Sequence, residues 1–193
     1  PKFNKFPRPR EFSLVAQAGL IQYSDDHSKF MENVFTQKPV NNTLGECLSR
    51  ANKTQFRLAE TEKYPHVTFF FNSGIETPAL GESWCMVPSP KVQTYDLEPE
   101  MSAQAVTEKL LALIKSNSYD FILVNYANPD MVGHTGSLDA AISACEVVDD
   151  CLGDVYRKLN SIGGVLLVTA DHGNCEVMYD SINESPHTSH TLN

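Results

Sequence analysis

The stretch LLVTADHGNCEVMYD, residues 166–180, decides the fold class. It begins inside an apolar, β-branched run, GVLLVTA over residues 164–170, which is typical of a strand buried on both faces of a parallel sheet. The run ends abruptly, and Asp171 and His172 stand side by side just beyond it. We therefore expect a strand whose carboxyl end presents two potential metal ligands.

Helical and strand patterns alternate through the rest of the chain. In residues 138–160, apolar residues recur at alternating steps of three and four, which predicts an amphipathic helix. The predicted strands are 55–60, 66–72, 119–127 and 164–170, the predicted helices are 11–20, 43–52, 101–116 and 138–160, and the Gly- and Pro-rich residues 74–99 are predicted to form a loop. This alternation predicts an α/β fold, with a mostly parallel sheet and helices on both faces.

The composition narrows the classes of function. A formal net charge of -9 argues against a nucleic-acid or membrane partner, and an anionic substrate would need bound metals or a local cationic pocket. The five cysteines are odd in number and include no Cys-x-x-Cys pair, which favours a reducing, cytoplasmic compartment. No apolar run approaches membrane-spanning length. We expect a small-molecule substrate.

Three polar clusters carry the candidate chemistry. Asp130 and His134, in NPDMVGHTG, follow the predicted strand at 119–127, and Asp171 and His172 follow the strand at 164–170. Ligands of such sheets bind beyond the carboxyl ends of the strands, where both clusters fall. Carboxylate and imidazole together suit Zn, Mn, Fe or Co better than Ca, and two neighbouring ions can clamp both oxygens of a phosphoryl transfer. The third cluster, PHTSHT, contains His187 and His190.

Each of these residues also has a simpler interpretation. Asp130 could cap a helix, His134 could be a loop histidine with a hydrogen-bond partner, and Asp171 could begin a turn. His187 and His190 could belong to a disordered tail. The metal site is favoured because two independent strands both end in Asp and His.

Two further residues have weaker signals. Lys63 could meet an anion or be an ordinary exposed lysine, and Cys175 could be a nucleophile, a soft ligand or a small buried thiol. The chain has no Gly-x-Ser-x-Gly elbow and no P-loop. The sequence therefore supplies metal ligands without an evident nucleophile.

Five motifs together resemble the cofactor-independent phosphoglycerate mutase family of the alkaline phosphatase superfamily. They are ETEKYPHVTFFFN, VPSPKVQTYDLEPEMSA, NYANPDMVGHTG, LLVTADHGN and HTSHT, in the family's order. The resemblance implies an isomerase of glycolysis and gluconeogenesis that interconverts 3-phosphoglycerate and 2-phosphoglycerate through a phosphoserine. It also implies two divalent metal ions, Mn by expectation with Mg or Co as alternatives, and a monomeric full-length protein.

The resemblance also implies roles for particular residues. Asp130, His134 and His190 match the ligands of one metal, and Asp171 and His172 match ligands of the other, whereas His187 matches no ligand position. Family members complete the second site with an Asp and the catalytic Ser from their N-terminal part, neither of which is in this chain. Lys63 matches a lysine beside the nucleophile and the phosphate.

The resemblance divides the chain into two parts. Residues 39–193 correspond to the C-terminal part of a metal-binding, phosphatase-like domain, and residues 1–38 to a remnant of a second, substrate-binding domain with its hinge. Arg8 and Arg10 resemble a family arginine signature only if the spacing is altered. The alternatives are a phosphopentomutase or phosphomonoesterase on the same scaffold, or a non-catalytic metal-binding module. We expect the chain by itself to have little or no activity.

Overall fold

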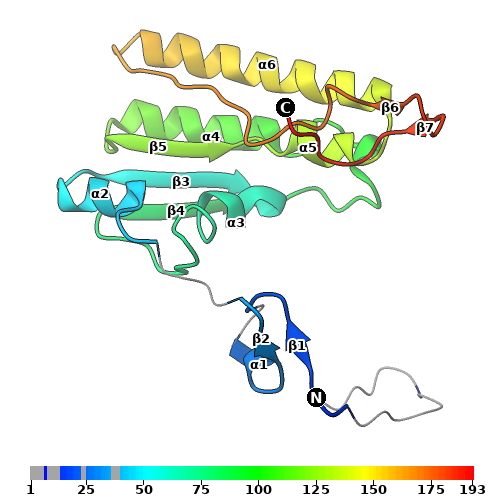
Figure 1. The fold of residues 1–193 in the computed structure, drawn as a ribbon. Helices are drawn as coiled ribbons and strands as arrows, with labels where there is room; N and C mark the ends of the chain where they lie inside the picture. Colours follow the sequence, from blue (N-terminus) through cyan, green and yellow to red (C-terminus); the bar gives the residue numbers. More distant parts are fainter. Residues whose placement is uncertain (1–6, 8–13, 23–24, 36–39) are drawn as a thin grey trace. The chain divides into compact units, whose positions relative to one another are not determined.

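The structure is a computed structural model that describes residues 7, 14–22, 25–35 and 40–193 (Figure 1). Its contacts divide the chain into two units, residues 1–40 and residues 41–193. Every residue of the predicted metal site belongs to the second unit. In the described part of the chain, no helix is both long enough and apolar enough to cross a membrane.

The first unit contains two short strands and one short helix. β1 (Ala18–Gly19) pairs in parallel with β2 (Glu32–Asn33), and α1 (Asp25–Ser28) lies between them in the chain. The backbone N–H of Glu32 donates to the carbonyl of Gln17 at 3.1 Å. Because this pairing uses backbone groups that a helix would need, the helix predicted at 11–20 is wrong over its described residues, 14–20; residues 11–13, Arg8 and Arg10 lie outside the described part.

The second unit is built on a three-stranded parallel sheet. Its strands are β3 (Gln55–Glu60), β4 (Glu82–Val87) and β5 (Phe121–Asn125), in the spatial order β4-β3-β5. Its helices are α2 (Leu44–Arg50), η1 (Thr61–Lys63), α3 (Tyr64–Val67), η2 (Tyr95–Leu97), α4 (Ala103–Ser116), α5 (Asn128–Gly133) and α6 (Leu138–Asn160). An antiparallel hairpin, β6 (Tyr179–Asp180) and β7 (Ser185–Pro186), precedes the C-terminus. β3 and β5 end on the side where α3, α5 and this hairpin lie (Figure 1).

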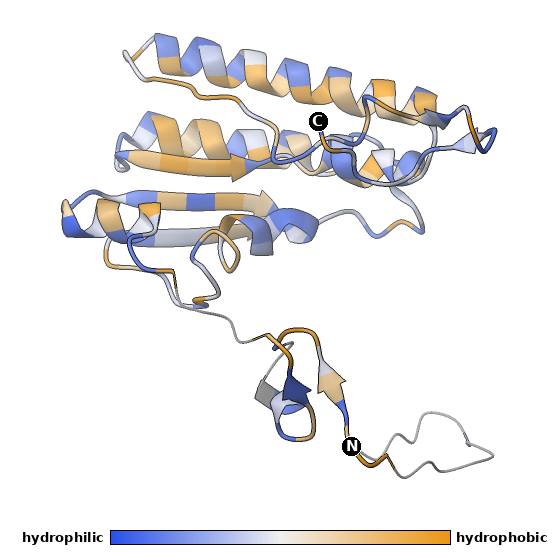
Figure 2. Ribbon diagram, in the orientation of Figure 1, coloured by the Kyte–Doolittle hydropathy of each residue, from blue (hydrophilic) through white to orange (hydrophobic). Residues whose placement is uncertain are grey.

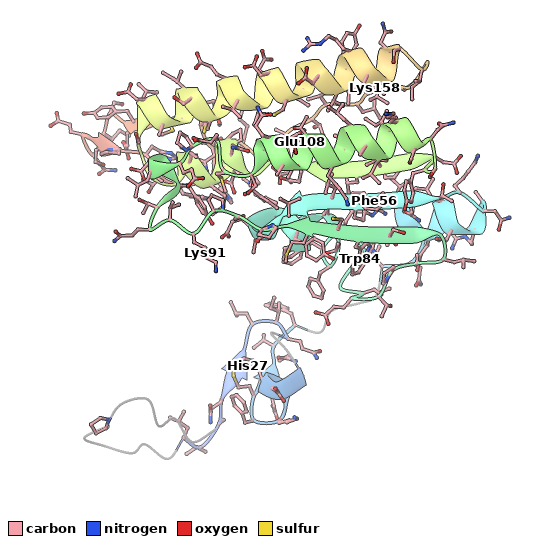
Figure 3. All side chains as sticks on the ribbon, turned by 180° about the vertical axis from the view of Figure 1, so that it is seen from behind. His27, Phe56, Trp84, Lys91, Glu108 and Lys158 are labelled. Atoms are coloured by element: carbon pink, nitrogen blue, oxygen red, sulfur yellow. The ribbon has the colours of Figure 1, made fainter. Side chains whose placement is uncertain are left out.

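Alternate residues of β3 bury against helices on opposite faces of the sheet. Phe56 and Leu58 join a core cluster with apolar residues of α4, which lies over β5 when the molecule is seen from behind (Figure 3). On the other face, Nε2 of Gln55 donates to the carbonyl of Gly45 in α2 at 2.8 Å, and Nε of the buried Arg57 pairs with Oε1 of Glu82 at 3.0 Å. The predicted α/β fold, a parallel sheet with helices on both faces, is confirmed.

The helices predicted at 43–52, 101–116 and 138–160 are confirmed, and local signals explain their ends. The side chain of Thr43 and that of Glu46 form a reciprocal capping box at the start of α2. The hydroxyl of Ser137 accepts the N–H of Ala140 at the start of α6, whose apolar stripe faces α4 and α5 (Figure 2). α4 ends at Asn117, which adopts a left-handed conformation with a φ of 50°.

The strand predicted at 66–72 is wrong. Pro65 lies in the first turn of α3, and the hydroxyl of Thr68 donates to the carbonyl of Tyr64 at 2.7 Å. The aromatic residues that made this run resemble a strand pack against one another and against Arg57 of β3 instead. The ring of Phe70 lies 5.3 Å from that of His66, and the ring of Phe71 lies beneath the guanidinium of Arg57. Pro65 and the helical turns that follow it override the β propensity of this segment.

The strand predicted at 164–170 is also wrong in this structure. The segment runs extended from the end of α6, and within the described residues it pairs with no strand. Leu166 packs against the core cluster, but Val165 is 84% exposed, Leu167 87% and Val168 65%. A strand requires a neighbouring backbone edge, and β5 is bonded to β3 on one side only.

The loop predicted at 74–99 contains a strand that the sequence pattern hid. β4 pairs with β3 in parallel, with Arg57 opposite Trp84. Its flanks carry Gly81 and Pro88, which are residues typical of loops. β4 forms because Oε1 of Glu82 accepts hydrogen bonds from Arg57, from the amide of Asn72 and from the indole of Trp84.

Candidate metal centre

Asp130 and His134 come to one face of α5 because they lie one helical turn apart. α5 starts after β5 and has Pro129 in its first turn, and the cap position is Ala127. Asp130 therefore belongs to the first turn of the helix and is not its cap. Nε2 of His134 lies 3.2 Å from Oδ1 of Asp130, as the spacing of four residues allows.

Lys63 is buried between the two predicted clusters. Its Nζ lies 2.8 Å from Oδ2 of Asp130 and 3.8 Å from Oδ2 of Asp171, and its side chain is 3% exposed. The interpretation of Lys63 as an exposed surface lysine is wrong. The helical turns η1 and α3, which replace the predicted strand, place its ammonium group at the end of β3.

Asp171 and His172 lie on the same side of the fold as α5. Oδ1 of Asp171 is 3.7 Å from Nε2 of His172, which in turn lies 3.9 Å from Oδ1 of Asp130. The amide of Asn125, the last residue of β5, donates to Oδ2 of Asp171 at 3.4 Å. The side chain of Asp171 is 47% exposed, whereas that of Asp130 is 13% exposed.

The C-terminal segment brings His190 to the same point. Its Nε2 lies 3.0 Å from Oδ1 of Asp130 and 3.0 Å from Nε2 of His134, and its ring stacks on that of His172 with 3.8 Å between centroids. An isolated antiparallel bridge between Gly173 and Thr191 ties the segment down. His190 is therefore part of an ordered site and does not lie in a free tail.

Hydrogen bonds that the Nδ1 nitrogens of His134 and His172 donate to backbone carbonyls define which ring atoms are left for a cation. Nδ1 of His134 lies 2.7 Å from the carbonyl of Thr188, so it carries the proton and donates it. Nε2 of His134 then presents a lone pair toward Oδ1 of Asp130. Nδ1 of His172 has the same relation to the carbonyl of Gly173, at 3.3 Å.

The convergence of these lone pairs fits a divalent metal. Lone pairs and a carboxylate oxygen repel one another unless a proton or a metal ion lies among them, and nitrogen and oxygen donors together suit a borderline transition metal. One ligand atom from each of Asp130, His172 and His190 lies within 4.8 Å of the others. The side-chain set therefore fits the group that the sequence predicts.

The charge of Asp130 is stabilised by its neighbours. Burial by itself would raise the pKa of Asp130, but hydrogen bonds from the Lys63 ammonium and the Asn174 amide outweigh it, and the pKa falls to about 2. Asp130 is consequently an anion at neutral pH and available to a metal.

The structure brings all but one of the histidines and carboxylates weighed from the sequence into this site. Asp130, His134, Asp171, His172, His190 and Lys63 converge, as their distances show. His187 does not join them. Its backbone N–H donates to the carbonyl of Met178, and its Nδ1 is buried with no hydrogen-bond partner among the described residues.

Two asparagines belong to the site but were missed in the sequence. Asn125 holds Asp171, and the amide of Asn174 donates to Oδ1 of Asp130 at 2.8 Å. Asn174 directly follows Asp171, His172 and Gly173, in the stretch for which a turn beginning at Asp171 was the simpler interpretation. Partial burial and the adjacent thiol of Cys145 raise the pKa of Cys175 to about 11, which fits a partly buried thiol rather than a nucleophile.

Comparison with known proteins identifies the family. A family model described as the metalloenzyme superfamily matches residues 16–193. A relative from Ruegeria sp. (strain TM1040) is 55% identical over 192 residues, covering 100% of this chain and 37% of its own length. A relative from Agrobacterium fabrum is 55% identical over 191 residues, covering 99% and 37%. Both are named 2,3-bisphosphoglycerate-independent phosphoglycerate mutase.

A solved structure agrees with these relatives. A Leishmania mexicana phosphoglycerate mutase, crystallised at low cobalt concentration, matches with a TM-score of 0.82 and 34% identity, over 100% of this chain and 37% of that one. The chain spans 37% of the length of each of these three proteins. The chain therefore belongs to the metalloenzyme superfamily and resembles, along its whole length, the 2,3-bisphosphoglycerate-independent phosphoglycerate mutases.

Proposed function

We propose that this chain provides the metal-binding part of an enzyme that interconverts 3-phosphoglycerate and 2-phosphoglycerate. The observation that carries the proposal is the convergence of Asp130, His134, His172 and His190 beside the buried ammonium of Lys63. Donors for cations and a fixed positive charge at one point suit the transfer of a phosphoryl group. The similarity to phosphoglycerate mutases selects glycerate as the carrier of that group.

We propose that the site holds two divalent ions, with Mn as the preferred metal. Asp130, His134 and His190 would hold one ion, and Asp171 and His172 would contribute to the other. When bound, such ions lower the pKa of an attacking hydroxyl and balance the charge of the phosphoryl group. Two hydrogen bonds support this assignment: His134 donates one to the carbonyl of Thr188, and the amide of Asn125 donates one to Asp171, which orients His134 and Asp171.

Lys63 contributes a charge whose position is fixed. Its ammonium is held by Oδ2 of Asp130 and lies near Oδ2 of Asp171, so it cannot follow the substrate as an exposed lysine could. A phosphoryl group that entered between the two clusters would meet this positive charge without reorganisation of the protein. The overall negative charge of the chain is then no obstacle, because the attraction is local.

We propose that a serine nucleophile and a further aspartate come from the remainder of a longer protein. Two features support this proposal. The outer edge of β5 is open among the described strands, and three apolar residues of the segment after α6 are exposed: Val165, Leu167 and Val168. An additional strand beside β5 would bury such side chains near the metal centre. We also propose that this longer protein acts as a cytoplasmic monomer.

A chimera tests the proposed function. The matching 37% of the Ruegeria relative is replaced by this chain, and conversion of 3-phosphoglycerate is measured with Mn²⁺. We expect turnover by the chimera, loss of turnover in the Asp130→Ala and His190→Ala variants, and little or no turnover by the chain alone. A folded chimera that hydrolyses simple phosphate esters or acts on sugar phosphates, but leaves phosphoglycerate unchanged, would contradict the proposal.

A further inference from the structure

We propose that Asn174 is a positioning residue of the metal centre, which orients the carboxylate of Asp130, and that position 133 is glycine because this side chain needs the space. The inference deepens the metal-binding role proposed above and rests on it. Asn174 is 4% exposed and comes from the loop after Asp171 and His172, whereas Asp130 lies in α5.

The side-chain amide of Asn174 donates hydrogen bonds to two oxygens of Asp130. Its Nδ2 lies 2.8 Å from Oδ1 of Asp130 and 3.1 Å from the backbone carbonyl of the same residue. Both neighbours are acceptors, so the opposite orientation of the amide would set oxygen against oxygen. The donor assignment therefore follows from the contacts, and both hydrogens of the amide go to one residue.

These hydrogen bonds fix the position of Oδ1 of Asp130, which faces the histidines. Lys63 holds Oδ2, and the terminal torsion of an aspartate side chain is broad when only one oxygen is held. Asn174 holds Oδ1, the atom that lies 3.0 Å from Nε2 of His190 and 3.2 Å from Nε2 of His134. The lysine and the asparagine together leave the carboxylate with one orientation.

Gly133 makes room for the amide. A Cβ at position 133 would lie 2.5 Å from Oδ1 and 2.8 Å from Cγ of Asn174, and 3.0 Å from the sulfur of Cys175. Asn174 could not move aside without breaking its bonds to Asp130. Its Oδ1 is buried and has no hydrogen-bond partner in the described part of the chain, which indicates that the two contacts of its Nδ2 determine the position of the side chain.

The loop that carries Asn174 is itself tied to the segment of His190. The backbone N–H of Asn174 donates to Oε2 of Glu176 at 2.7 Å, and the hydroxyl of Thr191 donates to Oε1 of the same carboxylate. The N–H of Thr191 donates to the carbonyl of Gly173 at 2.9 Å. One set of hydrogen bonds therefore connects the placement of Asp130 to that of His190.

Binding of Mn²⁺ to the 193-residue chain, followed by the electron paramagnetic resonance signal of free Mn²⁺, tests the inference. Removing a residue that hydrogen-bonds to a metal ligand weakens metal binding by about 10- to 100-fold, and we expect a loss of this size for Asn174→Ala. For Gly133→Ala we expect a change in the same direction. In the Asp130→Ala background, Asn174→Ala should cause no further loss, because it acts through that carboxylate. Asn183→Ala is the matched control. It removes an exposed hydrogen bond from the side-chain amide to Asp180 and should leave the affinity for Mn²⁺ unchanged.

The outcomes separate this inference from the proposal beneath it. Equal affinity of the unmodified chain and Asp130→Ala would refute the metal site itself. Loss in Asp130→Ala with unchanged affinity in a folded Asn174→Ala variant, or equal losses from Asn174→Ala in both backgrounds, would refute the role of Asn174 alone. If a variant fails to fold, the unmodified chain decides: the side-chain ¹⁵N amide signal of Asn174 should shift on saturation with Mg²⁺, and a signal that stays unchanged would overturn the inference.

Discussion

Replacing Lys63 by Met should destabilise the metal-free chain, because it removes the charge partner of a buried carboxylate. Nζ of Lys63 lies 2.8 Å from Oδ2 of Asp130, and both side chains are largely shielded from solvent. At an effective dielectric constant of about 20, two unit charges at this distance attract by about 6 kcal/mol. Methionine keeps the length and apolar stem of lysine and removes only the charge.

The lowered pKa of Asp130 gives a smaller figure, which is the net stabilisation of the charged carboxylate by Lys63, Asn174 and His134 against the effect of burial. Its fall from 3.8 to about 2 corresponds to about 2 kcal/mol at neutral pH. The two figures differ because burial acts against the charged form and consumes part of the attraction. We expect Lys63→Met to lower the free energy of unfolding by about 3 kcal/mol, since Asp130 is then left buried without its cation.

The pH dependence provides a second criterion. A carboxylate with a depressed pKa stabilises the fold above its unfolded pKa, and this contribution is lost as pH falls through the folded value. The difference between the unmodified chain and Lys63→Met should therefore be full at pH 7 and shrink as pH falls from about 4 toward about 2.

Urea unfolding in the presence of EDTA, followed by the fluorescence of Trp84, measures both quantities. Lys91→Met is the matched control, because Lys91 is exposed (Figure 3) and its loss should change the free energy of unfolding by less than about 0.5 kcal/mol. The reasoning is refuted if Lys63→Met is as stable as the control at pH 7, or if the difference does not decrease on acidification.

Three further results are expected. Glu82→Ala should cost about 3–5 kcal/mol in urea unfolding, because it leaves the guanidinium of Arg57 buried without its partner, and a cost below about 1 kcal/mol would show that the pair does not support the sheet. Since burial raises its pKa to about 11, Cys175 should react with iodoacetamide at pH 8 at least about ten times more slowly than the exposed Cys47, as mass spectrometry can show; equal rates would contradict the burial. Leu167→Lys should change the stability of the chain alone by less than about 0.5 kcal/mol, since Leu167 is exposed, yet abolish activity of the chimera; an active chimera would argue against a strand at this position.

Local signals in the sequence predicted much of the fold. The apolar stripe of α6 depends on short-range spacing, and this helix appears as expected. β3 and β5 were also predicted, because their runs are continuous and lack Pro. The errors arose where tertiary context decides. Pro65 turned an aromatic run into helical turns, and β4 forms through contacts of Glu82 with residues distant in the sequence.

The segment 164–170 has the sequence pattern of a buried strand but does not form one. Its residues are apolar and β-branched, but a strand forms only by pairing with a second strand. Within the described part of the chain, no strand pairs with this segment or with the outer edge of β5. The sequence of one strand cannot supply the other. Val165 and Leu167 are exposed because no partner strand covers them.

The metal centre was predicted in part. The turn from Asp130 to His134, and the rule that ligands gather beyond strand ends, were enough to place those residues together. The burial of Lys63 could not be predicted, because it depends on two carboxylates that approach from different segments. Asn174 escaped notice since turns are rich in asparagine, and only its contacts with Asp130 separate a turn residue from a positioning one.

The most direct test of the metal centre is an anomalous difference map from crystals of the chain grown with Mn²⁺. The account predicts a peak at coordination distance from Oδ1 of Asp130 and from Nε2 of His134 and His190. Saturating Mn²⁺ that yields peaks only elsewhere on the molecule, or none at this cluster, would contradict it.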